Sequence, residues 1–382
     1  MRIAISHLSL NFLGGEERLC LSFIGALKRS GHHVTLCTIE KTNWEMVHKV
    51  FGNTIMPDEE IFMTTLPLHG AFSKAFVPLL SYLSYLKGLF KLNFKRNYDI
   101  IINTYGDIFN SIADIAYVHF PIIATLDYQQ IPAFTSPIKW RICSQAYKFF
   151  NHFINNVKPS IILANSKFTQ LVIKKYLHKD SLLLHPPVEV QNHLSENSKR
   201  KNYVITISKF TPKRCLHKIP LIAQQTRNAK FIMAGIADQY STKTIQNIHK
   251  LIKNCNVEDR VTIMPNVPRS TLLNLLKTAK AYLHTMPFEH FGTSIIEAMA
   301  SGCVPIVHRS GGPWIDILDQ KQAVSGFSYI TIKEAAEIVD SVMCDEKLRR
   351  KVSSNARKRA MHYNTITFEK RLRVLIRSFK AC

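Results

Sequence analysis

The feature that most constrains this chain is a regular alternation of short apolar strands with helices along its length. Apolar runs that predict strands in the first half lie at Arg2–Ser6, His33–Ile39, Asp99–Asn103, Ile115–His119 and Ser160–Ala164. Arg18–Ser30 and Lys167–Leu177 between them have the apolar spacing of helices. Parallel strands need crossover connections, which helices supply, so the alternation predicts an α/β fold with parallel sheets.

The alternation stops at the polar segment 191–202, which we predict to be a linker, and then restarts. Strands of the second half are predicted at Tyr203–Ile207, Lys230–Gly235, Val261–Met264, Ala281–Thr285 and Val304–His308. A chain of 382 residues is too long for one ordinary core. We therefore expect two doubly wound, Rossmann-like domains, residues 1–190 and 203–365, facing each other across a cleft. The basic helix at 366–382 is expected to pack back on the first domain.

The chain is strongly basic, with 50 Lys and Arg against 27 acidic residues and a net charge of +23. Such a charge attracts nucleic acid, anionic membranes or phosphorylated small molecules, although it can also be an ordinary solvated surface. The basic residues are spread over both halves instead of forming a stripe with aromatic platforms, so no specific nucleic acid is expected. Leu79–Arg96 and Trp140–Lys158 mix aromatic and basic residues. They would either lie on an anionic bilayer or pack on the sheet as amphipathic helices.

Several function classes leave no trace in the sequence. The chain has no Walker loop, GxGxxG or HExxH motif, which argues against an ATPase, a dehydrogenase and a zinc protease. Its eight cysteines form no CxxC pair and no zinc-finger spacing, so we expect neither a metal site nor a disulfide framework. Together with a first strand that lacks the long apolar run of a signal peptide, this predicts a cytoplasmic protein.

The segment from Glu289 to Gly312 is the strongest candidate for a binding site. Gly292 and Thr293 open a predicted helix, whose free N–H groups favour an anion such as a diphosphate. Glu289 precedes this helix and Glu297 lies about one turn into it, where carboxylates can accept hydrogen bonds from sugar hydroxyls. Two such glutamates alone could simply be solvated. However, five of the chain's 14 glycines fall in one stretch, at Gly292, Gly302, Gly311, Gly312 and Gly326. Glycines gather where backbone must approach a ligand closely, which favours a site for a sugar diphosphate.

This segment resembles the donor-site signature of family 4 glycosyltransferases, which are retaining enzymes of the GT-B fold. The matching pattern is Glu289-x-Phe291-Gly292-x4-Glu297, followed by Ala-Met-Ala-Ser-Gly-Cys-Val-Pro-Ile-Val and Ser-Gly-Gly-Pro. The resemblance implies that Glu289 contacts the donor sugar as a catalytic residue and Glu297 the nucleotide ribose. The backbone at Phe291, Gly292 and Thr293 would meet the sugar and the phosphates.

Other segments extend the resemblance. Lys209 and Arg214 match the two residues that supply cations to the diphosphate, although the family usually has Arg first and Lys five positions later. Gly14 and Gly15 resemble the family's glycine loop after the first strand. His119, at the end of a predicted strand, matches a histidine that the family places near the donor sugar and the reaction centre.

The resemblance implies transfer of a hexose from a nucleoside diphosphate sugar with retained anomeric configuration, without a cofactor or metal ion. The motifs are most similar to those of the α-1,2-mannosyltransferases of dolichol-linked glycan assembly, which implies GDP-mannose as donor and a glycan or lipid-linked glycan as acceptor. A lipid-linked acceptor would bring the chain to the cytoplasmic face of a membrane as a peripheral protein. Two alternatives stay open, namely a nucleic-acid-binding protein with a degenerate GT-B core and a sugar-nucleotide epimerase of similar fold.

Overall fold

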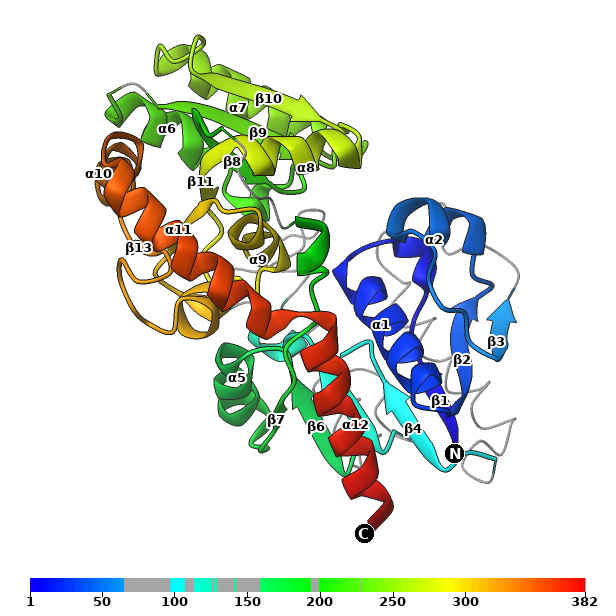
Figure 1. The fold of residues 1–382 in the computed structure, drawn as a ribbon. Coiled ribbons are helices and arrows are strands. Elements are labelled where there is room, and N and C mark those ends of the chain that lie inside the picture. Colours follow the sequence, from blue (N-terminus) through cyan, green and yellow to red (C-terminus); the bar gives the residue numbers. More distant parts are fainter. Residues whose placement is uncertain are drawn as a thin grey trace. The chain divides into compact units, whose positions relative to one another are not determined.

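The computed structural model describes residues 1–64, 97–106, 113–125, 127–128, 141, 159–193, 199–227 and 229–381. They form two compact units (Figure 1). Unit 1 comprises Met1–Pro187 and Thr365–Cys382, and unit 2 comprises Val188–Asn364. Two segments were predicted to lie on a bilayer or to pack as amphipathic helices. The first, Leu79–Arg96, lies wholly outside the described residues, and of the second, Trp140–Lys158, only Arg141 is described.

Unit 1 is built on a parallel sheet of seven strands in the order β3-β2-β1-β4-β5-β6-β7. The strands are β1 (Arg2–Ser6), β2 (His33–Glu40), β3 (Glu59–Thr64), β4 (Ile100–Asn103), β5 (Ile115–Val118), β6 (Ile161–Ala164) and β7 (Leu182–Leu183). The helices of this unit include α1 (Gly15–Arg29), α2 (Trp44–Phe51), α5 (Lys167–Leu177) and α12 (Thr365–Ala381).

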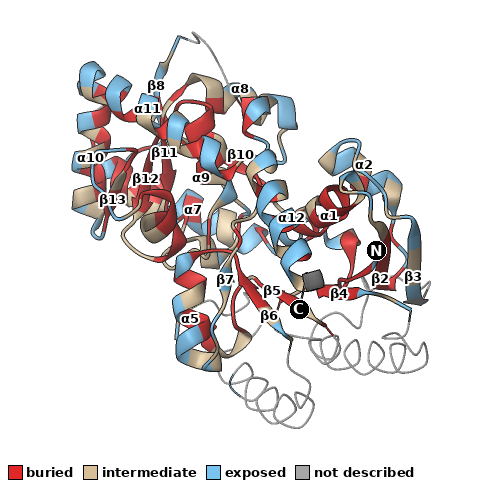
Figure 2. Cartoon of the chain, turned by 60° about the horizontal axis from the view of Figure 1, so that its bottom comes forward, coloured by how far each residue is buried: buried red, intermediate tan, exposed pale blue. Residues whose placement is uncertain are grey.

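The core of unit 1 is completed by α12, the last helix of the chain. Its Phe368, Leu372 and Ile376 are buried with residues of β1 and α1. The ring of Phe23 on α1 meets that of Phe368 edge-on, with 5.3 Å between their centroids. Figure 2 shows β4, β5 and β6 and the inner face of α1 as largely buried, whereas the edge strand β3 and one face of α12 are exposed.

Unit 2 is built on a parallel sheet of six strands in the order β10-β9-β8-β11-β12-β13. The strands are β8 (Lys201–Ile207), β9 (Lys230–Gly235), β10 (Val261–Pro265), β11 (Ala279–His284), β12 (Val304–His308) and β13 (Phe327–Tyr329). The helices are α6 (Lys218–Gln225), α7 (Thr242–Asn254), α8 (Arg269–Thr278), α9 (Thr293–Ala300), α10 (Ile332–Cys344) and α11 (Glu346–Ala360).

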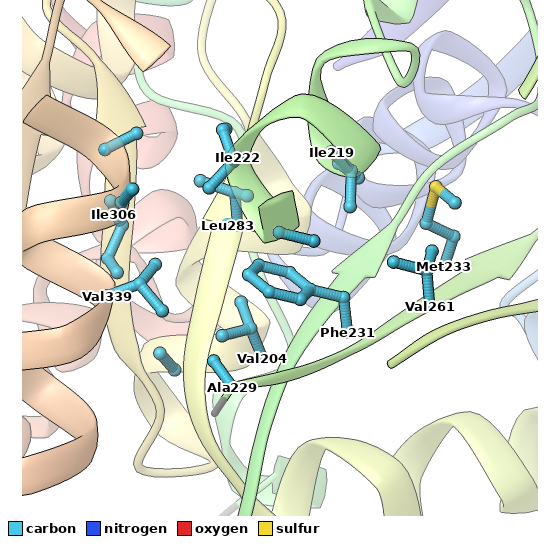
Figure 3. Close-up of a cluster of buried hydrophobic side chains, with 14 of the residues drawn as sticks. Val204, Ile219, Ile222, Ala229, Phe231, Met233, Val261, Leu283, Ile306 and Val339 are labelled. Atoms are coloured by element: carbon cyan, nitrogen blue, oxygen red, sulfur yellow. The ribbon is translucent and has the colours of Figure 1, made fainter. Parts of the chain in front are cut away.

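Both faces of the unit 2 sheet are buried. Successive residues of β8 point to opposite faces, so Val204 joins one hydrophobic cluster and Ile205 the other. On the first face, Figure 3 shows the ring of Phe231 lying among Val204, Ile219 and Ile222. A sheet covered on both faces by helices is the doubly wound architecture, which confirms the predicted fold class for each unit.

In each sheet there is one point at which the strand order reverses. In unit 1 the order reverses between β1 and β4, and in unit 2 between β8 and β11. Open parallel sheets bind ligands outside the carboxyl ends of the strands at such a reversal.

The junction between the two sheets differs in detail from the predicted linker at 191–202. A short helical turn, η4 (Val190–His193), starts before it, and β8 begins at Lys201 because that residue already pairs with Ala279 of β11.

Candidate functional site

Glu289 lies in the loop that follows β11, at the strand reversal of unit 2. Its side chain is 12% exposed and accepts a hydrogen bond from the guanidinium Nη1 of Arg214. Arg214 reaches it from η5 (Pro212–Arg214), which follows the neighbouring strand β8. On the other side, Nε2 of His284, the last residue of β11, lies 3.5 Å from Oε2 of Glu289. The two strands at the reversal therefore hold one carboxylate between two nitrogen groups.

This carboxylate is ionised at neutral pH. Burial alone would raise the pKa of Glu289, but the Arg214 guanidinium and the neighbouring His284 hold the pKa well below its usual value. A buried carboxylate that keeps its charge is a strong hydrogen-bond acceptor for sugar hydroxyls.

The two predicted diphosphate cations are engaged differently. Arg214 is fixed by Glu289 and by its own carbonyl oxygen, which accepts a hydrogen bond from Oγ1 of Thr285 at 2.8 Å. Nζ of Lys209 instead lies 2.9 Å from a carboxylate oxygen of Asp238, and both side chains are well exposed. The structure thus brings Arg214 to Glu289, whereas it pairs Lys209 with a surface carboxylate beyond β9.

Helix α9 begins at Thr293, one residue after Gly292. Gly292 has φ +97°, and a Cβ there would lie 2.6 Å from Cδ1 of Ile295, so the turn requires glycine. The hydroxyl of Tyr282 on β11 lies 3.0 Å from the carbonyl oxygen of Ile207 and 2.8 Å from Oγ of Ser294. It therefore ties the end of β8 to the first turn of α9, where backbone N–H groups favour an anion.

Glu297 lies on α9 and is largely buried. Its Oε1 is 3.8 Å from Nε2 of His193, and Nδ1 of His193 is 3.2 Å from Oγ of Ser301. Burial is the main cause that raises the pKa of the Tyr282 phenol, and the charge of Glu297 adds to it while that of Arg214 opposes it. Glu297 and Arg214 are thus both near enough to Tyr282 for their charges to act on it.

A second loop, residues 310–312, supports the loop that carries Glu289. The N–H of Gly312 donates to the carbonyl oxygen of Glu289 at 2.8 Å, and Oγ of Ser310 accepts from the N–H of Phe288 at 2.8 Å. Gly311 has φ +70°, and a Cβ there would lie 2.4 Å from the carbonyl oxygen of Glu289. Gly311 and Gly312, two of the five glycines that stood out in the sequence, therefore let these two loops approach each other closely.

In unit 1, Gly14 caps helix α1 and Gly15 is its first residue. The N–H of Gly14 donates to Oε2 of Glu17 at 2.6 Å. The helix begins three residues before the predicted Arg18, because Glu17 folds inward to make this bond. Its other oxygen, Oε1, lies 3.7 Å from Nε2 of the buried His7.

His119 directly follows β5 and is linked to the same group. Nδ1 of His7 lies 3.0 Å from Oγ1 of Thr104, and the carbonyl oxygen of Thr104 lies 3.0 Å from Nε2 of His119. A carbonyl can only accept, so this nitrogen carries a proton and Nδ1 of a neutral His119 does not. A polar network therefore joins Gly14 to His119 across the carboxyl ends of β1, β4 and β5.

The sequence did not single out several members of these two groups. They are His7, Glu17, Thr104, His193, Tyr282 and His284. His7, Thr104 and His284 end or directly follow strands, and this position could have indicated them. Glu17 lies in the first turn of α1, Tyr282 within β11 and His193 in η4, so their positions give no such signal.

Two properties of the described residues bear on ligands. Nowhere in the part of the chain that the structure describes do three or more His, Cys, Asp or Glu side chains form a group able to hold a metal ion. No helix within the described ranges combines the length and the apolar character needed to cross a membrane.

Comparison with known proteins extends this description. Residues 190–359 match the family model of glycosyl transferases group 1. The chain is 26% identical over 259 residues to the GDP-Man:Man(3)GlcNAc(2)-PP-Dol alpha-1,2-mannosyltransferase of Dictyostelium discoideum, a match that covers 62% of this chain and 50% of that protein. The chain thus spans about half the length of the curated relative it matches.

The fold is similar to solved structures over nearly the whole chain. Anabaena HepE, in complex with UDP and glucose, has a TM-score of 0.71 at 17% identity, covering 99% of this chain and 100% of HepE. Sucrose-phosphate synthase from Thermosynechococcus elongatus has a TM-score of 0.75 at 15% identity, covering 100% of this chain and 99% of the synthase. The chain has the GT-B fold that the sequence predicts, and its residues 190–359 are a domain of the glycosyl transferases group 1 family.

Proposed function

We propose that the chain transfers mannose from GDP-mannose to a hydroxyl of a glycan or lipid-linked glycan, with the anomeric configuration retained. The observation that carries this proposal is the buried, ionised carboxylate of Glu289, held by Arg214 and His284 at the strand reversal of unit 2. The choice of mannose and of a lipid-linked acceptor is supported by the curated relatives, which are named for both.

Each element of the unit 2 site has a place in this reaction. Glu289 accepts hydrogen bonds from the donor sugar, and Glu297 binds the nucleotide ribose. The backbone at Phe291, Gly292 and Thr293 meets the sugar and the phosphates at the start of α9. A helix N-terminus stabilises the negative charge that develops on a departing diphosphate.

The cations need to rearrange when the donor binds. A diphosphate competes with Glu289 for the guanidinium of Arg214 and with Asp238 for the exposed ammonium of Lys209. The five donors of Arg214 allow it to contact both Glu289 and a phosphate oxygen, because one guanidinium can bridge two anions. Lys209 gives up a surface ion pair at little cost.

In unit 1, we propose that His119, Gly14 and Gly15 contact the donor sugar, with His119 as a catalytic residue. The network through Thr104 and His7 fixes the ring of His119 and the start of α1. The reaction uses no metal ion and no cofactor, since cations of the chain and a helix terminus neutralise the diphosphate. A lipid-linked acceptor places the chain at the cytoplasmic face of a membrane.

The test is a transfer assay with GDP-mannose and a lipid-linked glycan, in which the product is identified by its mass and linkage. Glu289→Gln should lower kcat/KM by about 10²- to 10³-fold, the usual cost of removing one preorganised contact to the reacting group. The control is Glu334→Gln, which breaks a more exposed ion pair with Arg309 in the same unit and should leave transfer unchanged. EDTA should not slow the reaction.

Three outcomes would contradict the proposal. Equal activity of Glu289→Gln and wild type would contradict the assignment of Glu289 to the donor site. Failure of every GDP- and UDP-sugar to raise the melting temperature would count against an enzyme of this class. Interconversion of sugar nucleotides without an acceptor would favour the epimerase alternative.

A further inference from the structure

A basic hollow lies in unit 1, away from the residues of the candidate site. It has a volume of about 500 Å³ and is lined by Arg29, Ser30 and His32 after α1 and by Arg373 and Arg377 of α12. Met1, which precedes β1, also lines it. The residues before β1 and β2 are at the amino ends of these strands, whereas His119 follows the carboxyl end of β5. The hollow is therefore on the opposite edge of the sheet from the proposed reaction.

The charge in this hollow is poorly neutralised. None of its lining residues is acidic. Arg29 forms an ion pair with Glu369 at 2.5 Å, and Nε of Arg373 has only a long contact of 3.4 Å to Oγ of Ser30. Arg377 makes neither an ion pair nor a hydrogen bond within the part of the chain that the structure describes. Among the residues that the structure describes, three guanidinium groups thus face one space with a single carboxylate beside them.

Helix capping does not account for these arginines. Cations near the end of a helix interact favourably with its dipole and can hydrogen-bond to its last carbonyl oxygens. At the end of α1, however, the backbone N–H groups of Ser30, Gly31 and His32 already donate to those oxygens. The guanidinium donors of Arg373 and Arg377 are therefore available to a ligand.

We propose that this hollow binds a phosphate group, carried either by a lipid headgroup or by a soluble phosphate compound. Guanidinium groups match phosphate oxygens in charge and geometry, and several arginines around one space form the usual arrangement for binding them. The volume is in the range of small-molecule sites. Because the three arginines are partly exposed, salt weakens the binding. The site is independent of the proposed transfer reaction.

The experiment compares two probes on the full chain, inorganic phosphate and vesicles that contain phosphatidic acid, with phosphatidylcholine vesicles as the blank. The double variant Arg373→Gln/Arg377→Gln should weaken binding by about tenfold or more, since each charge-assisted hydrogen bond is worth at least the free energy of a tenfold change. The matched control is Lys370→Gln/Arg371→Gln, which removes the same charge from another flank of the same helix. It should change binding by less than about twofold.

The outcomes separate the two sources and decide the proposal. Binding of vesicles but not of phosphate identifies a lipid headgroup, and binding of both identifies a general phosphate site. All the substituted side chains are exposed, so melting temperatures should stay within about 2 °C of wild type. The proposal is overturned if neither probe binds, or if the control pair weakens binding as much as the arginine pair, since the effect then belongs to net charge alone.

Discussion

At the scale of single residues, one arrangement recurs, in which the imidazole of a histidine lies next to the carboxylate of a largely buried glutamate. In each case the histidine comes from another segment and its Nε2 lies 3.5–3.8 Å from a carboxylate oxygen. The pairs are His7 with Glu17, His193 with Glu297 and His284 with Glu289. For Glu17 and Glu289 the pKa is lowered despite burial, so these two carboxylates stay charged inside the protein.

The pair of His7 and Glu17 should make the stability of unit 1 depend on pH. Burial by itself would lower the pKa of His7, but the facing Cys20 and Glu17 raise it to about 10, and the pKa of Glu17 is lowered. The raised pKa of His7 stabilises the folded state fully at pH values below the pKa of histidine in the unfolded chain, about 6.5. This contribution is lost as the pH rises through 10. The lowered pKa of Glu17 stabilises the folded state at pH values above the pKa of glutamate in the unfolded chain, about 4.3. This contribution is lost as the pH falls through the pKa of Glu17 in the folded protein. The contribution is therefore largest between these two unfolded values.

We expect His7→Gln to lower the free energy of unfolding by about 3–5 kcal/mol at pH 5.5, because it leaves Glu17 buried without its partner. The loss should shrink toward pH 10. Urea unfolding at several pH values measures it. The control is His33→Gln, since His33 lies at the same 3.7 Å from Glu59 but both side chains are exposed. A loss at His7 that did not vary with pH would show that packing and not charge is responsible.

In the unit 2 site, the sequence says more about where the glutamates lie than about which groups pair with the cations. Glu289 and Glu297 belong to one spaced motif, which places Glu289 in the loop before α9 and Glu297 on that helix. Which carboxylate a cation pairs with depends on the tertiary structure and not on the local sequence. Asp238, 29 residues after Lys209, carries no sign in the sequence that it will take that ammonium. Similarly, the segment around Arg214 indicates a cation but not that it will lie on Glu289.

At the scale of elements, the donor half-site consists of two loops that brace each other. The loop 310–312 contacts the loop 288–291 through a backbone hydrogen bond from Gly312 to Glu289 and through Oγ of Ser310, which accepts from the N–H of Phe288. A site built in this way depends on the absence of side chains at particular positions. Its geometry is therefore sensitive to the smallest substitution.

Gly311→Ala should destabilise unit 2 by about 2 kcal/mol or more, because a Cβ combines an unfavourable positive φ with a clash against Glu289. The affinity for the sugar nucleotide should fall with it, since the carbonyl that the clash displaces belongs to Glu289. The control, for stability alone and measured without nucleotide sugar, is Gly15→Ala in unit 1, where a Cβ would meet nothing within 4 Å. Thermal melting with and without nucleotide sugar measures both effects. Equal melting temperatures for the two variants would contradict the steric explanation.

Elements with a strong local pattern were predicted to the residue, and short ones were not. The predicted bounds agree with the structure for Arg2–Ser6, Lys167–Leu177, Lys230–Gly235 and Val304–His308. In contrast, β7 has two residues and β13 has three, too few to show a period of two. These strands exist because a neighbouring strand offers its hydrogen-bonding edge, which is a tertiary effect.

At the scale of the whole molecule, the two units differ in continuity. Unit 2 is one uninterrupted segment, whereas unit 1 takes its last helix from residues that follow unit 2 in the sequence. Leu372 of α12 is 1% exposed and belongs to the same core as Phe23 and Ile24 of α1. The stability of unit 1 therefore depends on residues more than 300 positions away from its first strand.

We expect Leu372→Ala to destabilise unit 1 by about 2–5 kcal/mol, the range for truncating a buried leucine. Hydrogen exchange should quicken in β1 and α1 but not in β9, because the cavity opens in the core of unit 1 alone. Leu171→Ala on α5 is the control, since Leu171 is 62% exposed and its loss should cost less than about 0.5 kcal/mol. Faster exchange in both units would show that they unfold as one.

The position of α12 also affects the order in which the two units can fold while the chain is being synthesised. A ribosome releases the strands of unit 1 first, then all of unit 2, and only afterwards the helix that closes the first core. Unit 2 can finish folding on the nascent chain, whereas the half that emerges first must wait, with the faces of β1 and α1 that α12 covers still open to solvent. A premature stop codon near the end of the message would therefore harm the part of the protein that was translated earliest.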